Sequence, residues 1–390
     1  MKKQFLFMAC LMASTLWAVE PADVVRAYDH ANGGYVLVDA SGEVLAFSKD
    51  GSVADDLESL QAVLEAEGLT LEVMPQRAAN ADGDGYEIPE LAADSVGPLL
   101  KDIAFSQSAP YNLMTPLDSK NNYRRCVTGC VATAMAEIMT YWRWPEKCNP
   151  TVVTYHAAHL DQDLTIDYDT MAFDWDNILP YYANGASGTK QQQMAVSRLM
   201  WACGVAAHMN YTSGSSGTQS NLVPDAFVKQ FNYARGVSFD ARGDYTDNAF
   251  NEMLIEELDA ARPMYASGQY TGTEVGFDGG HAFVIDGYAY LVKDVNKTKP
   301  YFHFNWGWNG TDQKGRRYLW YRLSSGKDLA PYISGLQVIR GLQPNRATPV
   351  EETEMQTIDN GKIYDILGRE VSETKSGQLY IRNGKKYIAK

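Results

Sequence analysis

The sequence is poor in positive charge, in histidine and in cysteine. Lys and Arg total 34 against 48 Asp and Glu, which argues against a protein that grips phosphate backbones, so we expect no nucleic-acid partner. The six histidines form no ligand pattern such as H-E-x-x-H, and the C-x3-C pair lacks the second pair that a zinc site needs. We therefore expect no bound metal and no other cofactor.

Long apolar runs are also missing, apart from one near the start, Phe5–Trp17, which is too short to cross a bilayer. Two lysines precede this run and the small residue Ala18 follows it, as in an export signal. We therefore predict a signal peptide over residues 1–18. A lipobox at Cys10 is the competing interpretation, although the residues before that cysteine fit it badly.

Four cysteines remain once the signal is removed. An even number in an exported protein permits two disulfides but does not require them. Cys126 is either half of a disulfide with Cys148 or a decoy for a nucleophile at Cys130, and the fourth cysteine is Cys203. Because a disulfide would abolish a reactive thiol, we predict that Cys130 is free in the active protein.

Acidic residues gather in one early segment. Residues 19–96 hold 17 acidic and three basic residues, whereas the rest of the chain is close to neutral. Such a segment is either a solvated face or a separately charged domain that can detach from the main body. Within it, residues 34–48 are typical of a β-hairpin, and apolar residues recur at helical spacing over Leu57–Leu64.

The composition changes near Gly97, beyond which the chain is rich in Tyr, Trp, Asn and Gly. Helices precede strands, an order that favours an α+β domain with two subregions. The predicted helices cover Cys130–Trp142, Gln191–Cys203 and Phe250–Ala261, and the predicted strands cover Ala282–Tyr288, Tyr301–Trp306, Tyr318–Leu323 and Leu336–Ile339. After Gln343 the chain becomes polar, so we predict a linker over 344–361 and a few short strands over 362–390.

Cys130 is the first candidate for chemistry because it stands where a helix is predicted to begin. The positive end of the helix dipole and the unpaired N–H groups favour a thiolate at that place. The alternative is a buried structural cysteine, which is the commoner fate of this residue type.

A cysteine nucleophile needs a base that is distant in sequence and close in space. His281 follows two glycines at the mouth of an apolar strand, where it can point into a cleft and act as that base. The alternative is a histidine satisfied within the core. The stretch 302–310 adds the amide of Asn305, which can orient an imidazole, and the indoles of Trp306 and Trp308, which can shield the pair from water. The alternative there is a strand end with aromatic packing.

Taken together, these strings closely resemble the streptopain family of papain-like cysteine peptidases. The resemblance spans about 104–343 and rests on PYNLMTP at 110–116, GCVATAMAEIM at 129–139, WDNILP at 175–180, GHAFVIDG at 280–287 and NWGW at 305–308. It implies a papain-like catalytic domain over 97–343 with a helical part and an antiparallel β part, preceded by a small α+β propeptide over 19–96 and followed by a short β-rich tail.

The resemblance also implies roles for individual residues. Cys130 would attack the scissile carbonyl, and His281 would move the proton. The oxyanion would be stabilised by the Cys130 backbone N–H and the Gln107 side chain. Wider papain relatives carry a glutamine six residues before the nucleophile, where this chain has Arg124.

Two further positions depend on the same resemblance. The imidazole would be oriented by Asn305, as in the papain pattern, or by Trp306 packing beside the histidine. Family members carry glutamine where this chain has Glu137, within the predicted helix that begins at Cys130.

By the same resemblance, the acidic segment would cover the cleft as an intramolecular inhibitor until the chain is cut between Ala93 and Lys101. Residues 362–390 are similar to the C-terminal sorting tails of proteins exported by the type IX route, which implies secretion machinery as a partner. We therefore expect a bacterial protein that is secreted or held at the cell surface.

The hypothesis is a secreted endopeptidase made as a zymogen, which hydrolyses protein or peptide substrates through an acyl-enzyme. A papain-like acyltransferase or amidase is an alternative, because the same thiol and imidazole serve any acyl transfer. A catalytically inactive surface binding module is a third possibility, and the presence of both catalytic residues argues against it.

Overall fold

The structure is a computed structural model in which the chain forms two compact units, residues 1–344 and 345–390. The predicted signal peptide and most of the predicted linker lie outside the described residues. The described residues are 24–30, 33–66, 68–74, 95–183, 187–270, 279–310, 318–323, 329–346, 362–365, 370–373, 375–376, 379–382 and 385–388.

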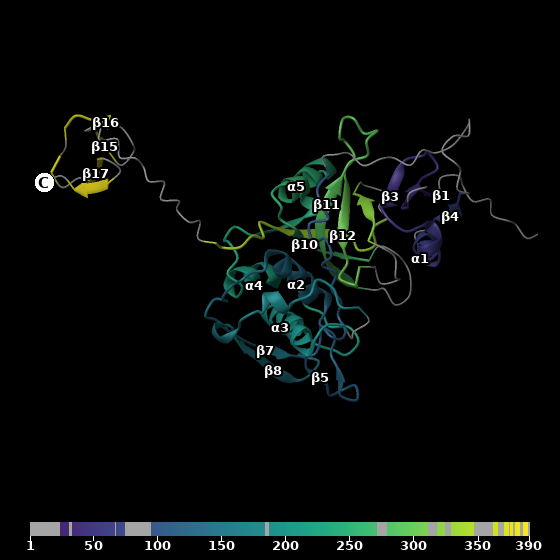
Figure 1. The fold of residues 1–390 in the computed structure, drawn as a ribbon, viewed down its shortest axis with the longest axis horizontal. Coiled ribbons are helices and arrows are strands. Elements are labelled where there is room, and N and C mark those ends of the chain that lie inside the picture. The colour runs from purple at the N-terminus through teal and green to yellow at the C-terminus, as the bar shows by residue number, and fades with distance from the viewer. Residues whose placement is uncertain are drawn as a thin grey trace, which may run out of the picture. The chain divides into compact units, whose positions relative to one another are not determined.

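The acidic N-terminal segment forms a small α+β layer, drawn in purple in Figure 1. The predicted hairpin is confirmed, because β2 pairs antiparallel with β3. The predicted helix is also confirmed, although it is longer than the apolar spacing indicated. The elements are β1 (Val24–Asp29), β2 (Tyr35–Val38), β3 (Val44–Ser48), α1 (Val53–Ala66) and β4 (Thr70–Val73).

One large sheet runs through the first unit in the order β4-β1-β2-β3-β13-β12-β11-β10-β14-β9. The N-terminal strands join it through β3, where Phe47 and Ala46 pair antiparallel with Trp320 and Tyr321 of β13. The acidic segment therefore extends the sheet of the central region. The remaining strands are β9 (Ser238–Ala241), β10 (Met264–Gln269), β11 (Gly280–Ala289), β12 (Tyr301–Asn305), β13 (Trp320–Arg322) and β14 (Ser334–Arg340).

Helices and a separate hairpin form the other part of the central region (Figure 1). The helix that begins at Cys130 packs against α3 on one side and against β11 on the other. Its residues 131–139 are all buried, as the run of small and apolar side chains predicts. The elements are β5 (Leu117–Asp118), β6 (Arg124–Arg125), α2 (Cys130–Trp142), β7 (Val152–Ala157), β8 (Gln162–Asp167), α3 (Lys190–Ala206), α4 (Val223–Lys229) and the short 3-10 turns η2 (Tyr168–Thr170), η3 (Trp175–Asn177) and η5 (Ser220–Leu222). The helix α5 (Asp247–Asp259) instead packs against β11, and η6 (Arg242–Asp244) contacts β14, so both lie with the large sheet.

This arrangement confirms the α+β class, and the three predicted helices and four predicted strands of the central region are present. Capping explains where the helices begin: the Thr189 hydroxyl and the Gln192 side chain form a capping box on α3, and the Thr246 hydroxyl caps α5. The β7–β8 hairpin has no counterpart among the predicted elements. Its strands alternate between buried and exposed side chains over a short length.

The C-terminal unit is a sheet of four short strands in the order β16-β15-β17-β18. This confirms the prediction of a few short strands near the end of the chain. The strands are β15 (Ile363–Asp365), β16 (Glu370–Val371), β17 (Leu379–Arg382) and β18 (Lys385–Ile388). Among the helices of the described ranges, none has the length and apolar character needed to cross a membrane.

Candidate active site

Cys130 is the first residue of α2, and Gly129 before it makes the sharp turn into the helix. Gly129 has φ 85°, in the left-handed region that favours glycine. A Cβ at this position would lie 2.7 Å from the Met209 sulfur and 2.9 Å from the Ser216 carbonyl oxygen. Only glycine fits this turn, which therefore fixes the thiol at the positive end of the helix.

Opposing influences act on the Cys130 thiol. Burial raises its pKa, while the backbone N–H groups of Ala282, Val131 and Cys130 itself act in the other direction. Ala282 is the second residue of β11 and directly follows His281. The structure thus brings the start of α2 against the start of β11, as the two motifs predict. With its pKa raised, the thiol is uncharged at neutral pH in this form of the chain.

His281 is buried and held on two sides. Its Nε2 lies 2.8 Å from the carbonyl oxygen of Trp306, and its ring stacks on Trp308 with centroids 4.0 Å apart and planes 15° apart. The Tyr332 ring lies 4.9 Å away. Because a carbonyl only accepts, Nε2 carries the proton, which leaves Nδ1 as the basic atom. Burial lowers the pKa of His281 to about 4, although the hydrogen bond to the Trp306 carbonyl acts to raise it. The imidazole is therefore neutral near pH 7.

The Asn305 side chain forms its hydrogen bonds with main-chain groups of Ile103 and Gly307. Its Nδ2 donates to the Ile103 carbonyl at 2.7 Å, and its Oδ1 accepts from the Gly307 N–H at 3.0 Å. These bonds fix the turn that contains Trp306, whose side chain is fully buried. The group that holds the imidazole is the Trp306 carbonyl. Sequence reasoning missed it, because a main-chain carbonyl leaves no signal in the residue type.

Gln107 lies beside the loop of residues 126–129, which leads to Cys130. Its carbonyl accepts from the Thr128 N–H at 3.0 Å, two residues before Cys130. The residue is half-buried, and its side-chain amide makes no hydrogen bond to any residue that the structure describes. The main chain of Gln107 is thus held against Thr128, two residues before Cys130. Arg124, which occupies the position of the papain-type glutamine, is exposed on β6.

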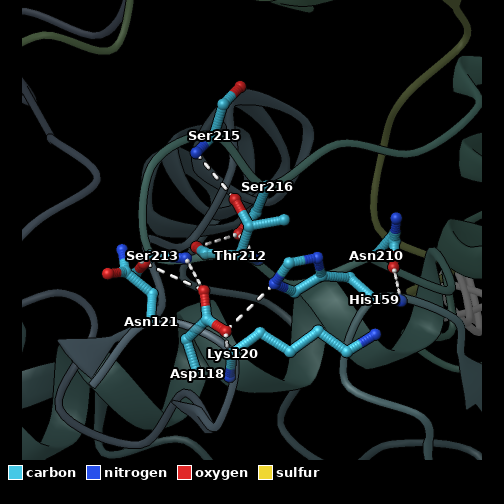
Figure 2. A network of polar contacts seen from close by, with 9 residues as sticks. All are labelled: Asp118, Lys120, Asn121, His159, Asn210, Thr212, Ser213, Ser215 and Ser216. Carbon is cyan, nitrogen blue, oxygen red and sulfur yellow. Dashed lines mark hydrogen bonds and ion pairs between the residues drawn. The ribbon is translucent and has the colours of Figure 1, made fainter. Parts of the chain in front are cut away.

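A polar network around Asp118 supports the loop that precedes Cys130, residues 126–129, through the neighbouring 212–217 loop (Figure 2). The buried Asp118 carboxylate accepts from the Ser213 N–H and hydroxyl and from His159 Nε2. Burial would raise the pKa of Asp118, but the hydrogen bonds from Ser213, His159 and the Lys120 N–H lower it to about 2. The carboxylate therefore stays ionised and holds the 212–217 loop in place.

The 212–217 loop in turn contacts the residues before Cys130. The Thr212 carbonyl accepts from the Val127 N–H at 3.0 Å, and the Ser216 hydroxyl donates to the Val127 carbonyl at 2.8 Å. In Figure 2 the Thr212 and Ser216 side chains lie above the carboxylate of Asp118. The 126–129 loop is thus held from this side by hydrogen bonds to its main chain, and the network is a set of contacts that sequence patterns did not reveal.

The cysteines of the described residues are all free thiols. The optional pairing of Cys126 with Cys148 is therefore not made. Burial raises the pKa of Cys126 to about 11 and that of Cys148 to about 12, and it raises the pKa of Cys203 well above the ordinary value of 9. Of these four thiols only Cys130 is partly exposed. It is thus the one that a substrate can reach.

Comparison with known proteins gives consistent similarities. Residues 105–314 match the peptidase C10 family. The chain is 31% identical over 302 residues to streptopain of Streptococcus pyogenes serotype M1, which covers 73% of this chain and 71% of that protein. It is 29% identical over 249 residues to the thiol protease/hemagglutinin PrtT of Porphyromonas gingivalis, over 62% of this chain and 26% of that protein.

Two solved structures are also similar. Active wild-type interpain A cysteine protease of Prevotella intermedia matches with a TM-score of 0.53 and 27% identity, over 64% of this chain and 96% of that chain. A prointerpain A fragment of the same organism matches with a TM-score of 0.57 and 24% identity, over 83% of this chain and 97% of that chain. Both support the papain-like arrangement expected from the sequence.

Proposed function

Because the chain belongs to the peptidase C10 family and is a cysteine peptidase, we propose that it is a secreted endopeptidase made as a zymogen. We assign the nucleophile to Cys130 and the general base to His281. The observation that carries this assignment is the approach of two elements: the thiol lies at the start of α2 against the Ala282 N–H, directly beside His281 on β11. Protein and peptide chains are the proposed substrates.

The proposed reaction begins with transfer of the Cys130 thiol proton to Nδ1 of His281. The Trp306 carbonyl holds Nε2–H throughout and stabilises the imidazolium that forms. The thiolate attacks the scissile carbonyl carbon, and the resulting oxyanion accepts hydrogen bonds from the Cys130 N–H and the Gln107 amide. The imidazolium then protonates the leaving amine, which leaves a thioester. Water attacks the thioester while His281 takes its proton, the C–S bond breaks to release the carboxylic acid product, and the imidazolium returns the proton to the Cys130 sulfur.

The acidic N-terminal segment is proposed to be the inhibitory propeptide. Its strand β3 extends the sheet at β13, and Glu43 forms ion pairs with Arg322 and Lys299 of the central region. Lys49 also lies over the Trp320 ring, 4.3 Å from its centroid. The prointerpain fragment covers more of this chain than active interpain A does, which supports a leading segment of the same kind.

The test compares the intact chain with a form cut near residue 95, using denatured casein and iodoacetamide. In the intact chain the pKa of Cys130 is raised and that of His281 is lowered to about 4, so we expect slow alkylation at neutral pH that speeds up only as the pH rises. The cut form is expected to alkylate at Cys130 near pH 7 and to degrade casein. Labelling of Cys130 without casein cleavage favours an acyltransferase or amidase. The absence of both labelling and cleavage favours a binding module.

The expected position of the cut depends on residues 96–100, which are hydrogen-bonded to β11. Val96 and Tyr288 exchange two backbone hydrogen bonds, and the Leu99 N–H donates to the Asp286 carbonyl at 2.7 Å. The Leu100 N–H donates to the buried Asp286 carboxylate at 3.1 Å. These bonds stabilise the catalytic region, so within the predicted window Ala93–Lys101 we expect the cut to leave Val96 with the catalytic domain, one residue ahead of the predicted boundary at 97. Intact-mass measurement of the secreted product checks this, and a mature end beyond Val96 would contradict it.

The two ends of the chain complete the proposal. Residues 1–18 are proposed to direct export as a signal peptide. Residues 362–390 are proposed to engage secretion machinery as a sorting tail, joined by a linker over 344–361 to a catalytic domain over 97–343. The break between the two compact units, after Pro344, supports this division.

A further inference from the structure

Glu137 is a buried acid in the helix of the nucleophile. It lies seven residues after Cys130 on α2 and is 0% exposed. Its Oε1 accepts from the Phe105 N–H at 2.9 Å. Its Oε2 has no hydrogen-bond partner within the part of the chain that the structure describes. A buried carboxyl group with an unpaired oxygen costs stability, so its presence calls for a reason.

Glu137 stands where three parts of the site meet. Phe105, which donates to it, lies two residues before Gln107, the proposed oxyanion donor. The Asn305 amide is close enough to favour its ionised form. The Asn305 side chain in turn donates to the Ile103 carbonyl and accepts from the Gly307 N–H. Asn305 and Gly307 are the two chain neighbours of Trp306. One carboxyl group on the helix of Cys130 therefore bonds the Gln107 segment through Phe105 and lies near Asn305, whose side chain fixes the turn whose carbonyl holds His281.

We propose that Glu137 is a positioning residue that fixes the Gln107 segment and the Trp306 turn against α2, and so sets the geometry between thiol, imidazole and oxyanion donor. This inference rests on the proposed function, because it assigns Glu137 a task in that same site. Glu137 does not touch the substrate. It acts through the Phe105 backbone and through Asn305.

The surroundings of Glu137 favour one of the two protonation states of its carboxyl group. Burial raises its pKa well above the ordinary value of 4.5, the Phe105 N–H opposes this, and the nearby Asp286 raises it further. The other titratable groups that act on it are Tyr111, and Tyr318 ahead of β13. None of these described neighbours is a cation. Burial among these neighbours therefore favours the uncharged acid, whose shape a glutamine matches closely.

The experiment compares Glu137→Gln with Glu137→Leu in the cut, active form. We expect Glu137→Gln to keep kcat and KM within about twofold of the wild type. We expect Glu137→Leu to lower kcat per folded molecule by at least about tenfold with KM within about twofold, because a misplaced site loses transition-state geometry rather than binding. The folded fraction is taken from near-ultraviolet circular dichroism, so that unfolded molecules do not count as slow enzyme.

A purely structural role predicts a different pattern, in which Glu137→Leu reduces the folded fraction but leaves kcat per folded molecule unchanged. That result overturns the inference, and so does a Glu137→Gln protein as slow as Glu137→Leu. If the leucine variant does not fold, Glu137→Met carries the same expectation, since methionine is flexible and close in length to glutamate.

Melting curves supply a readout that needs no activity. An acid whose pKa is higher in the folded protein holds more protons folded than unfolded, so wild-type stability falls as the pH rises above 4.5. Glu137→Gln lacks this loss, and its melting temperature is expected to gain on the wild type as the pH rises above 4.5. A constant difference contradicts an uncharged buried acid. A wild type that cleaves nothing defeats the proposed function, whereas an unimpaired Glu137→Leu defeats only this inference.

Discussion

Replacing Cys130 with alanine is expected to lower kcat/KM for a peptide substrate by at least about 10⁴-fold without unfolding the protein. Alanine is a good helix former and removes only the sulfur, so α2 and its packing persist. What disappears is the atom that forms the acyl-enzyme. The oxyanion donors and the binding cleft remain, and they alone give a small residual rate. Initial rates on a fluorogenic peptide, with circular dichroism to confirm folding, measure this effect.

Cys126→Ala is the matched control for that experiment. Cys126 lies four residues before Cys130 and is fully buried, and burial raises the pKa of its thiol to about 11. We expect this variant to retain activity. Activity lost with Cys126 and kept without Cys130 would show that the nucleophile is assigned to the wrong cysteine.

The Cys130→Ala protein also reports on maturation. If the thiol cuts its own acidic segment, the purified variant keeps that segment indefinitely. A pure variant that still loses it is matured by another peptidase.

Replacing His281 with alanine is expected to lower kcat/KM by about 10²-fold to 10⁴-fold, the range typical of a lost general base. Alanine cannot accept the thiol proton at the place of Nδ1, so the thiolate fraction of the cut form near pH 7 falls as well. The rate of Cys130 alkylation in the cut form, followed by mass spectrometry, should fall together with peptide hydrolysis.

His303→Gln is the matched control for the histidine. His303 lies on β12 next to β11, and its Nδ1 is 2.6 Å from Asp286 Oδ1 in a buried pair. A glutamine amide can still donate to that carboxylate, so we expect some loss of stability and little change in kcat per folded molecule. Equal losses of kcat in His281→Ala and His303→Gln would mean that neither histidine is specifically the base.

The helices and central strands were predictable because their signals are local. A helix such as α2 is marked by an uninterrupted run of small and apolar residues, and its start is marked by Gly129. The β7–β8 hairpin was missed because its strands are short and many of their side chains are exposed. The joining of β3 to β13 was also beyond the sequence, since the two strands lie far apart along the chain and pair through only Phe47 and Ala46.

For the site, the sequence by itself determined which side chains are proposed to carry the chemistry: a thiol at a helix start, an imidazole at a strand start and an amide near each. These groups are read from residue types and from the turns around them. Tertiary structure alone decided the partners. The Trp306 carbonyl rather than the Asn305 amide faces His281, and a buried Glu137 ties three segments together. Main-chain groups have the same chemistry at every position, and the fate of a buried acid depends on which distant segments enclose it, so only the folded chain can assign these roles.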